Sequence, residues 1–325
     1  MRDKVRIDPV KALGQANRKD HRLMRAATYA SAATATVLIA LKLIAWLTTD
    51  SVAILSSLVD SLLDLVASLV TLFAVRHALV PADAEHRFGH GKAEPLAALT
   101  QVGFIAASAV LLVLEAVERL VTPQPIQQTE IGMSVMAVSI AMTLALVMFQ
   151  RFVIARSASL AIEADSVHYK ADLLANLGVL GALIMAGPLG IGWVDPVFAI
   201  LVAGYIAHSA WGIGVESLNM LMDRELPEDD RERIKEIALG YPDVLDVHDL
   251  RTRKSGRDIY IQLHLDFNGI LSLNRIHSVT DAVENEIMEA FPGAEVIAHQ
   301  DPVAEDFADG IPVEDSETGS EKDKG

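Results

Sequence analysis

The chain has 325 residues, 51% of them hydrophobic, and a formal net charge of −16 at pH 7. Its apolar residues occur in long blocks, a pattern that excludes one ordinary soluble domain. Residues 304–325 hold eight acidic and two basic residues, and this acidic excess gives no support for binding to nucleic acid. The absence of cysteine excludes disulfides and thiolate metal ligands.

Six apolar segments are each long enough to cross a membrane, because a helix needs about 20 residues to span the hydrocarbon core. The charged residues 1–23 before them are not typical of a signal peptide, and we interpret them as an N-terminal extension. We expect the lipid bilayer to be crossed at Met24–Leu47, Val52–Val75, Leu96–Leu120, Ile131–Val153, Leu160–Met185 and Val194–Leu221.

Basic residues indicate the orientation of these spans. Lysine and arginine lie before span one, between spans two and three, between spans four and five, and after span six. The other connections hold at most one basic residue. Because basic residues stay on the cytoplasmic side, both termini are predicted to be cytoplasmic.

The character of the sequence changes after Leu226 and Pro227. Residues 228–239 and 272–291 predict helices, and residues 244–253, 258–267 and 294–298 predict strands. The order α-β-β-α-β predicts a small two-layer α+β domain with an antiparallel sheet. The expected domains are therefore an extension (1–23), a six-helix transmembrane domain (24–224), a cytoplasmic domain (225–302) and a disordered acidic tail (303–325).

Two pairs of metal-liking side chains occur inside predicted spans. Asp60 and Asp64 lie in span two, and His168 and Asp172 lie in span five. Each pair is four residues apart and so shares a helix face. An ionisable residue at the bilayer centre costs about 2.5–3.5 kcal/mol, which favours a functional role over hydrogen-bonded structural acids. If the two helices meet, three carboxylates and an imidazole would form a cage for a divalent ion.

Two further groups could hold a metal. In the connection between spans two and three, Asp83, His86 and His90 could chelate one ion, although a solvated loop with titrating histidines is an equally good interpretation. In the C-terminal domain, several histidines and one carboxylate lie on or beside elements that could converge, and this carboxylate could also bridge two ions. These residues are His248, His264, His277, His299 and Asp301.

With these residues in view, the chain resembles the cation diffusion facilitator family, especially its bacterial zinc- and iron-efflux branch. The strings that carry the likeness are SLVDSLLD, HRFGHGKAE, ADSVHYKADLLAN, LMDRELP, VHDLRTRKSG and HQDP. The resemblance implies a six-helix bundle with a ferredoxin-like cytoplasmic domain, assembled as a homodimer in the inner membrane. It implies a transport site at the intramembrane quartet, the loop site, and paired cytoplasmic metal sites at the dimer interface. It also implies an ion pair between Lys92 and Asp223 that ties the membrane bundle to the cytoplasmic domain.

The function expected from this is export of divalent metal in exchange for protons by alternating access. The ligand set suits Zn²⁺, Cd²⁺, Co²⁺, Fe²⁺ or Mn²⁺, and the lack of sulfur argues against Cu⁺. Among these ions we favour Zn²⁺, with Fe²⁺ and Cd²⁺ as alternatives. His168 is the expected proton switch, because an imidazole ordinarily titrates near pH 6.5. A passive cation channel would also need inward-facing carboxylates. An intramembrane aspartyl protease would need its two aspartates on different helices, so we expect a transporter and not an enzyme.

Overall fold

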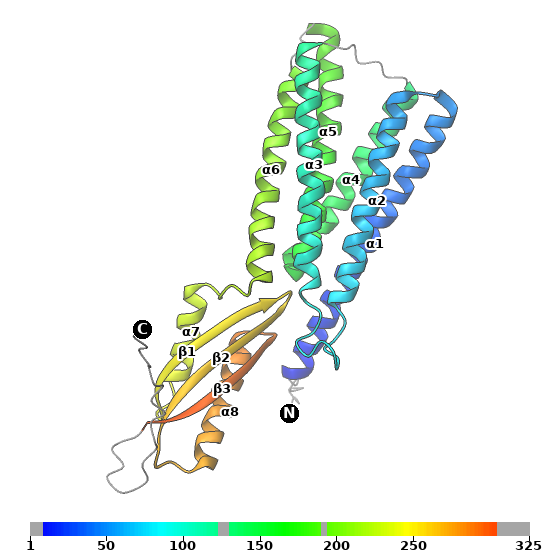
Figure 1. Cartoon of the computed structure of the whole chain (residues 1–325). Coiled ribbons are helices and arrows are strands. Elements are labelled where there is room, and N and C mark those ends of the chain that lie inside the picture. The colour runs from blue at the N-terminus through cyan, green and yellow to red at the C-terminus, as the bar shows by residue number, and fades with distance from the viewer. Residues whose placement is uncertain (1–8, 123–129, 190–193, 304–325) are drawn as a thin grey trace, which may run out of the picture. The chain divides into compact units, whose positions relative to one another are not determined.

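The computed structural model describes residues 9–122, 130–189 and 194–303 (Figure 1). Residues 1–8 and the expected acidic tail from residue 304 onward lie outside the described residues. The chain divides into two compact units. Unit 1 comprises the chain up to Leu226 together with residues 252–260 and 292–295, and unit 2 comprises residues 227–251, 261–291 and those from 296 onward.

Six long helices make up most of unit 1 (Figure 1). Their bounds contain the six predicted spans. One difference is that the first helix begins at Pro9 and so includes much of the predicted extension. The helices are α1 (Pro9–Thr49), α2 (Val52–Ala78), α3 (Ala93–Val121), α4 (Glu130–Ser157), α5 (Leu160–Leu189) and α6 (Val194–Leu221).

Five of these helices, namely α1, α2, α3, α4 and α6, are long and apolar enough to cross a membrane. The helix α5 is equally long, but its first half carries Glu163, Asp165, Lys170 and Asp172. Apart from Glu163 and Lys170, the side chains from Leu160 to Ala171 are buried. The polar first half of α5 is therefore enclosed by the bundle, where polar groups can find protein partners instead of lipid.

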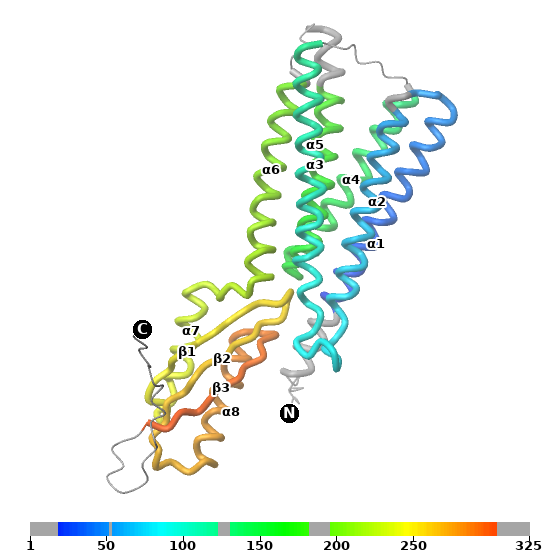
Figure 2. The backbone as a smooth tube through the Cα atoms, viewed as in Figure 1, coloured from blue at the N-terminus to red at the C-terminus, as the bar shows by residue number. Residues whose placement is uncertain are grey.

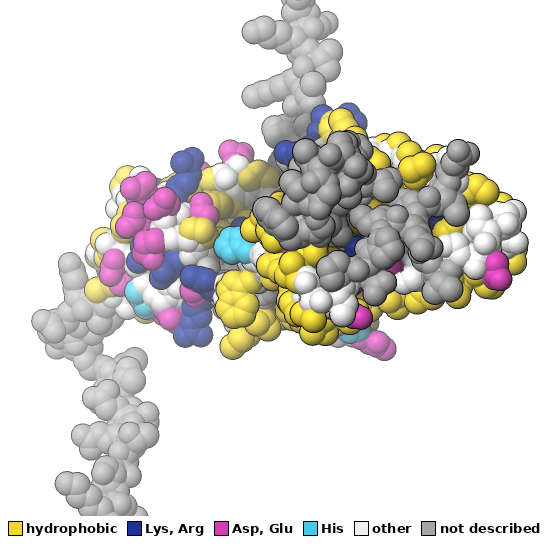
Figure 3. All heavy atoms as spheres, turned by 90° about the horizontal axis from the view of Figure 1, so that it is seen from above, with side chains coloured by type: hydrophobic (Ala, Val, Ile, Leu, Met, Phe, Trp, Pro, Cys, Tyr) yellow, Lys and Arg dark blue, Asp and Glu magenta, His cyan; other side chains and the backbone are white. Residues whose placement is uncertain are grey.

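Buried apolar side chains of the described bundle residues form several clusters. One joins α3, α5 and α6, and a second joins α1, α2, α4, α5 and the start of α3. A smaller one joins Leu146 and Val147 of α4 to Tyr169 of α5. Large hydrophobic side chains such as Phe73, Leu111 and Trp211 are exposed on the outer faces of the helices. Figure 3 shows hydrophobic side chains over much of the bundle. A surface of this kind suits hydrocarbon and not water.

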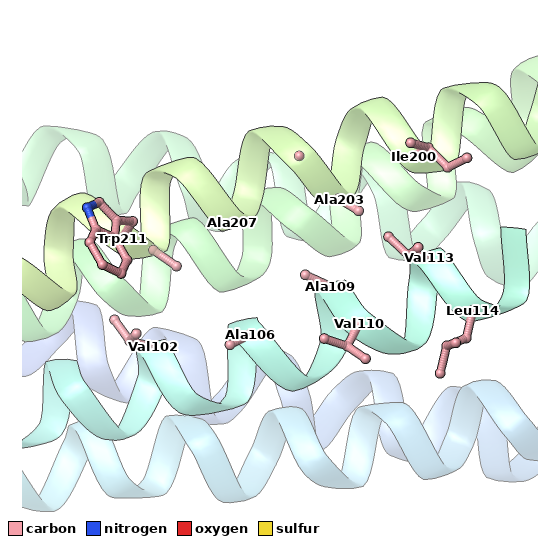
Figure 4. A pocket seen from close by; sticks show the side chains of 12 residues that line it. Val102, Ala106, Ala109, Val110, Val113, Leu114, Ile200, Ala203, Ala207 and Trp211 are labelled. Carbon is pink, nitrogen blue, oxygen red and sulfur yellow. The ribbon is translucent and has the colours of Figure 1, made fainter. Parts of the chain in front are cut away.

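An open apolar cavity of about 560 Å³ lies between α3 and α6 (Figure 4). Small residues such as Ala106, Ala109 and Ala203 leave this space, and Trp211 lies at one end. The lining holds no charged side chain. It therefore continues the lipid-compatible surface of the bundle.

The C-terminal part of the chain forms a three-stranded sheet in the order β1-β2-β3, with two helices. The helix α7 packs against α8, and buried apolar residues of both helices and of the sheet form the core. The element order matches the prediction, and β3 extends further than expected. The elements are α7 (Glu228–Leu239), β1 (Val244–Ser255), β2 (Asp258–Asn268), α8 (Leu273–Ala290) and β3 (Ala294–Val303).

The direction of β3 differs from the prediction of an antiparallel sheet. The strands β1 and β2 form an antiparallel hairpin, but α8 returns the chain so that β3 runs in the same direction as β2 (Figure 2). The amide of Ile259 near the start of β2 donates to the carbonyl of Gly293 just before β3, in agreement with this direction. A helical crossover joins parallel neighbours, whereas a tight turn joins antiparallel ones.

The alternation of β2 assigns its side chains to two faces. Ile261, Leu263, Leu265 and Phe267 are buried in the core, while His264 and the other alternate residues are on the opposite face. In β3, Val296 and Ala298 are buried, and the odd-numbered positions 297, 299 and 301 take the other face. The face of the sheet away from the core therefore carries the polar side chains of both strands.

Candidate metal sites

Three groups of ligand-type side chains come together among the described residues, each with candidate ligand atoms within 4.8 Å of one another. We name them the intramembrane cluster (Asp64, His168, Asp172), the loop cluster (Asp83, His86, His90) and the sheet cluster (His248, His264, Asp301). Two ligand atoms of a tetrahedral zinc site are about 3.3 Å apart, because each lies about 2.0–2.1 Å from the ion. Distances near this value therefore suit metal chelation.

The intramembrane cluster forms where α2 meets α5. The Nε2 atom of His168 lies 2.9 Å from Oδ1 of Asp64 and 3.7 Å from Oδ2 of Asp172. His168 is only 5% exposed. The Oδ2 atom of Asp172 is buried without a hydrogen-bond partner in the described part of the chain. The arrangement leaves an acceptor atom available for a cation between two helices.

Asp60 does not join this group within 4.8 Å, although we expected four ligands. It lies on α2 one helical turn before Asp64, and its residue is exposed. The i, i+4 spacing fixes only the shared face of the helix and not the distance to α5. The structure therefore brings three of the four predicted residues together and places the fourth one turn away.

A buried hydrogen-bond network fixes the start of α5 beside the cluster. The carboxylate of Asp165 accepts hydrogen bonds from Ser31 Oγ at 2.6 Å and Gln150 Nε2 at 2.7 Å. The hydroxyl of Tyr169 lies 2.8 Å from Ser68 Oγ and donates to the carbonyl of Ser31. These bonds join α5 to α1, α2 and α4 on either side of His168. The sequence shows Asp165, Tyr169 and Ser68 as polar residues inside apolar spans, which favours an inward orientation, but it does not reveal which helices they join.

The loop cluster is built by the turn after α2. Oδ1 of Asp83 lies 3.5 Å from Nδ1 of His86, and Oδ2 lies 3.4 Å from Nε2 of His90. Hydrogen bonds from the backbone amides of His86 and Glu85 hold the pKa of the Asp83 carboxyl below its ordinary value, and the carboxylate form is the one that binds metal. The Nδ1 atom of His90 lies 3.3 Å from the carbonyl of Val80, an orientation that leaves Nε2 for a ligand.

A further histidine lies beside the loop cluster. The ring of His77, in the last turn of α2, is 4.5 Å from the ring of His90. The sequence analysis did not single out His77, because it falls at the end of the apolar span and outside the Asp-x-x-His-x-x-x-His spacing.

The sheet cluster lies on the face of the sheet away from the core. Oδ2 of Asp301 is 2.7 Å from Nδ1 of His264 and 3.4 Å from Nε2 of His248. The hydrogen bond with His264 holds the pKa of the Asp301 carboxyl below its ordinary value. The carboxyl of Asp266 lies 3.1 Å from Nε2 of His248 and adds a carboxylate that we did not predict.

His299 approaches the same carboxylate from its other side. Its Nε2 atom is 3.3 Å from Oδ1 of Asp301, and its ring is 4.8 Å from the ring of His264. The two oxygens of Asp301 thus face different histidines, as a bridging carboxylate would. A cavity of about 320 Å³ opens beside them, lined in part by Asp249, His264 and His299.

His277 is not part of this group within one chain. It is on α8, on the side of the domain that holds the helices, and it is exposed. Its nearest charged neighbour is Asp281, 3.6 Å away in the next turn. The structure therefore gathers four of the five predicted residues of the C-terminal domain and leaves His277 apart.

Lys92 and Asp223, expected from the resemblance to pair, lie 2.9 Å apart in unit 1. Asp223 follows α6 and has a left-handed backbone conformation with φ of 55°. Arg253 approaches the same carboxylate at 3.4 Å. Two cations thus converge on one carboxylate where α6 ends.

Two family models match the chain. The model described as the cation efflux transmembrane domain matches residues 28–222, and the model described as the cytoplasmic domain of cation efflux proteins matches residues 226–303. The chain therefore belongs to the cation efflux family and is a multi-pass membrane transporter of cations, not an enzyme. The resemblance inferred from the sequence motifs is confirmed.

The relatives are bacterial cation-efflux pumps named FieF. The chain is 50% identical to that of Shewanella oneidensis over 280 residues, which is 86% of this chain and 94% of the relative. It is 44% identical to that of Yersinia enterocolitica over 283 residues, 87% of this chain and 94% of the relative. A solved structure of the putative zinc transporter CzrB is 31% identical and covers 24% of this chain and 99% of its own, with a TM-score of 0.24, too low for a comparison of folds.

Proposed function

We propose that this protein exports divalent metal cations from the cytoplasm in exchange for protons, with Zn²⁺ as the favoured substrate. The observation that carries the proposal is the intramembrane cluster. Two carboxylates and an imidazole from two helices converge on one point, where burial without a ligand would be costly. A metal ion that passes through this point would be held and then released.

The substrate preference is argued from the ligands alone. Mixed oxygen and nitrogen ligands without sulfur suit Zn²⁺, and the same set also accepts Fe²⁺ and Cd²⁺. Asp60 is the fourth ligand in our proposal, and a movement of α2 that brings its carboxylate toward His168 and Asp172 on α5 would close the cage around the ion. The position of Asp60 would then differ between the metal-bound and the metal-free site.

Proton exchange follows from the chemistry of the ligands. Carboxylates and imidazoles must lose protons before they bind a metal, so protons and metal compete for the same atoms. His168 is the proposed switch of this competition. With the bundle at residues 24–224 in the inner membrane and both termini cytoplasmic, an inward proton gradient would drive metal outward by alternating access.

The loop and sheet clusters bind metal on the cytoplasmic side in this proposal, within and beside a cytoplasmic domain at residues 225–302. We propose that the chain is a homodimer, in which His277 from a second copy completes the sites around Asp301. Metal bound between two chains would favour the dimer conformation that brings the cytoplasmic domains together. The cytoplasmic sites would then sense metal, while the intramembrane site carries it.

The test is transport by the purified protein in liposomes that contain a zinc-sensitive dye. An imposed proton gradient should drive Zn²⁺ against its own gradient, and collapse of the proton gradient should stop it. Asp64→Asn should abolish this transport, because it removes a charged ligand shared by α2 and α5. Zinc flux that persists unchanged without the proton gradient, together with a measurable conductance, would instead indicate a passive channel.

A further inference from the structure

Lys42 is a positive charge inside the bundle that the transport cycle described above does not use. It lies about two turns before the end of α1 at Thr49, and its Nζ atom donates to Ser61 Oγ at 2.7 Å and to the carbonyl of Ser57 at 3.1 Å. Ser57 and Ser61 occupy the same stripe of α2 as Asp60 and Asp64. The lysine therefore reaches from α1 to the helix that supplies the metal-binding carboxylates.

The charges that act on Lys42 are those of the intramembrane site. Its electrostatic neighbours are the carboxylates of Asp64, Asp172 and Asp60. In the described residues none of these carboxylates lies within the 4.0 Å of an ion pair with Nζ, whose partners are a hydroxyl and a carbonyl. The ammonium is held beside the site without occupying it.

An empty metal site inside a membrane is electrostatically unfavourable, because its negative charges lack a counter-ion. When the dication leaves, the carboxylates of the site remain in a medium where an uncompensated charge is costly. A nearby fixed cation reduces this cost, and it also repels the incoming dication. Both effects act in the same direction, because they stabilise the empty site relative to the loaded one.

We propose that Lys42 is a tethered counter-ion of the transport site, which stabilises the empty state and weakens metal binding enough for release. The inference rests on the proposed transport function. A transporter needs an affinity that is high enough to load and low enough to unload. Lys42 sets this balance through charge, without contact with the ion.

The competing explanation is a structural one, in which Lys42 only joins α1 to α2 by its hydrogen bonds. The two explanations differ for glutamine, whose amide can donate to Ser57 and Ser61 but carries no charge. Arginine keeps the charge, and methionine keeps neither property. Lys170, a half-buried lysine of α5 near Glu163 and Arg151, provides a control on another face of the helix, because residues two apart such as Lys170 and His168 do not face each other.

The experiment compares full-length Lys42→Gln, Lys42→Met, Lys42→Arg and Lys170→Gln proteins. Zn²⁺ binding to the intramembrane site is measured at about pH 8, where protons compete least with the metal. The loop and sheet clusters are silenced in all samples by His90→Ala and Asp301→Asn. Zinc transport in liposomes, with those two clusters intact, gives KM and the maximal rate separately.

A counter-ion role predicts that Lys42→Gln and Lys42→Met each bind Zn²⁺ about tenfold more tightly. Their KM and their maximal rate should both fall, because loading improves and release slows. Lys42→Arg and Lys170→Gln should remain within about twofold of the unsubstituted protein. Unchanged or weaker Zn²⁺ binding in Lys42→Gln overturns the inference, as does tighter binding in Lys42→Arg.

Asp64→Asn separates this inference from the function on which it rests. If that substitution leaves the measured Zn²⁺ binding intact, the proposed transport site itself is wrong. If it abolishes binding while Lys42→Gln binds as the unsubstituted protein does, only the counter-ion role is wrong.

Discussion

His168 lies where carboxylates from two helices meet, and this position defines its chemistry. It is close enough to Asp64 and Asp172 for all three to bind one ion, and nearly all of its surface is buried. The neighbouring Tyr169 and Asp165 are tied to other helices and hold the backbone of α5 in place. The neighbouring hydrogen bonds thus hold the imidazole of His168 in a position suited to metal binding.

Replacement of this imidazole should separate metal transport from the proton gradient. We expect His168→Ala to lose most Zn²⁺ transport and any residual flux to lose its dependence on the proton gradient, because the exchangeable ligand is gone. Transport into dye-loaded liposomes at several external pH values measures both effects. His208→Ala, at an exposed histidine of α6, is the matched control and should behave as the unsubstituted protein does. Normal proton dependence in His168→Ala would contradict the switch.

At the sheet cluster the carboxylate of Asp301 should remain a metal ligand as the pH falls below 7. The pKa of Asp301 is held below its ordinary value by the hydrogen bond from His264, so this carboxyl stays ionised as the pH falls from 7 to 5. Any loss of zinc from the cluster over that range should therefore not come from protonation of Asp301.

This expectation is checked by Zn²⁺ titration of the full-length protein at a series of pH values, with Asp301→Asn for comparison. Asp301→Asn should weaken binding at every pH and leave the midpoint of the pH dependence unchanged. A midpoint that moves with the substitution would mean that the carboxyl itself takes up the proton.

At the scale of elements, the loop after α2 and the turn of the β1-β2 hairpin are in close backbone contact within unit 1. Gly91 has no room for a Cβ atom, which would overlap the carbonyl of Ser255. Gly256 in the turn has a left-handed conformation with φ of 61° and approaches Gly91 in the same way. The glycine of the HGK string thus serves packing and not metal binding.

Substitution of this glycine should loosen the contact. We expect Gly91→Ala to lower the melting temperature, at a cost of about 1–3 kcal/mol for overpacking. Gly103→Ala is the matched control, because a Cβ atom there meets nothing within 4 Å and alanine favours the helix. Melting of both purified proteins in the same detergent decides the matter. If Gly91→Ala were as stable as Gly103→Ala, the backbone around Gly91 and Ser255 would have to accommodate a Cβ atom without loss of folding free energy.

Sequence patterns predicted the elements well where a physical period was strong. The helix α6 and the helix α7 have the predicted bounds, because apolar blocks and an amphipathic stripe define them. The direction of β3 was predicted wrongly, since alternation assigns faces and not direction. The distance of Asp60 from α5 was also beyond the sequence, because spacing along one helix says nothing about the approach of another. The network around Asp165 depends on side chains from several helices, which no local pattern encodes.

At the scale of the whole molecule, metal at the sheet cluster should change the relation between two copies of the chain. The chain has no cysteine, so one introduced cysteine can carry a unique spin label. We expect Glu289→Cys, labelled on the exposed side of α8, to show a shorter distance between labels in a dimer when Zn²⁺ is added. Pulsed electron resonance measures this distance.

The same labelled protein with Asp301→Asn serves as the control and should show no shortening. A label-to-label distance that stays constant across the zinc titration, without Asp301→Asn, would contradict the sensing role. A protein that remains a monomer at every concentration would contradict the proposed homodimer.

The helix α5 contributes to both of the larger apolar clusters of the bundle. Leu160, Ala164, Val167 and Ala171 pack with α3 and α6, whereas its neighbouring positions 161 and 162 pack with α1, α2 and α4. If α3 and α6 move apart from α1, α2 and α4 to admit water, α5 can stay packed against only one of these two groups. His168 and Asp172 are both on α5 and would therefore move together with it. If α5 stays with α3 and α6, the distance from these two ligands to Asp64 on α2 must change. Separation of α2 from α5 would therefore remove Asp64 from the ion and weaken metal binding, even before any ligand is protonated.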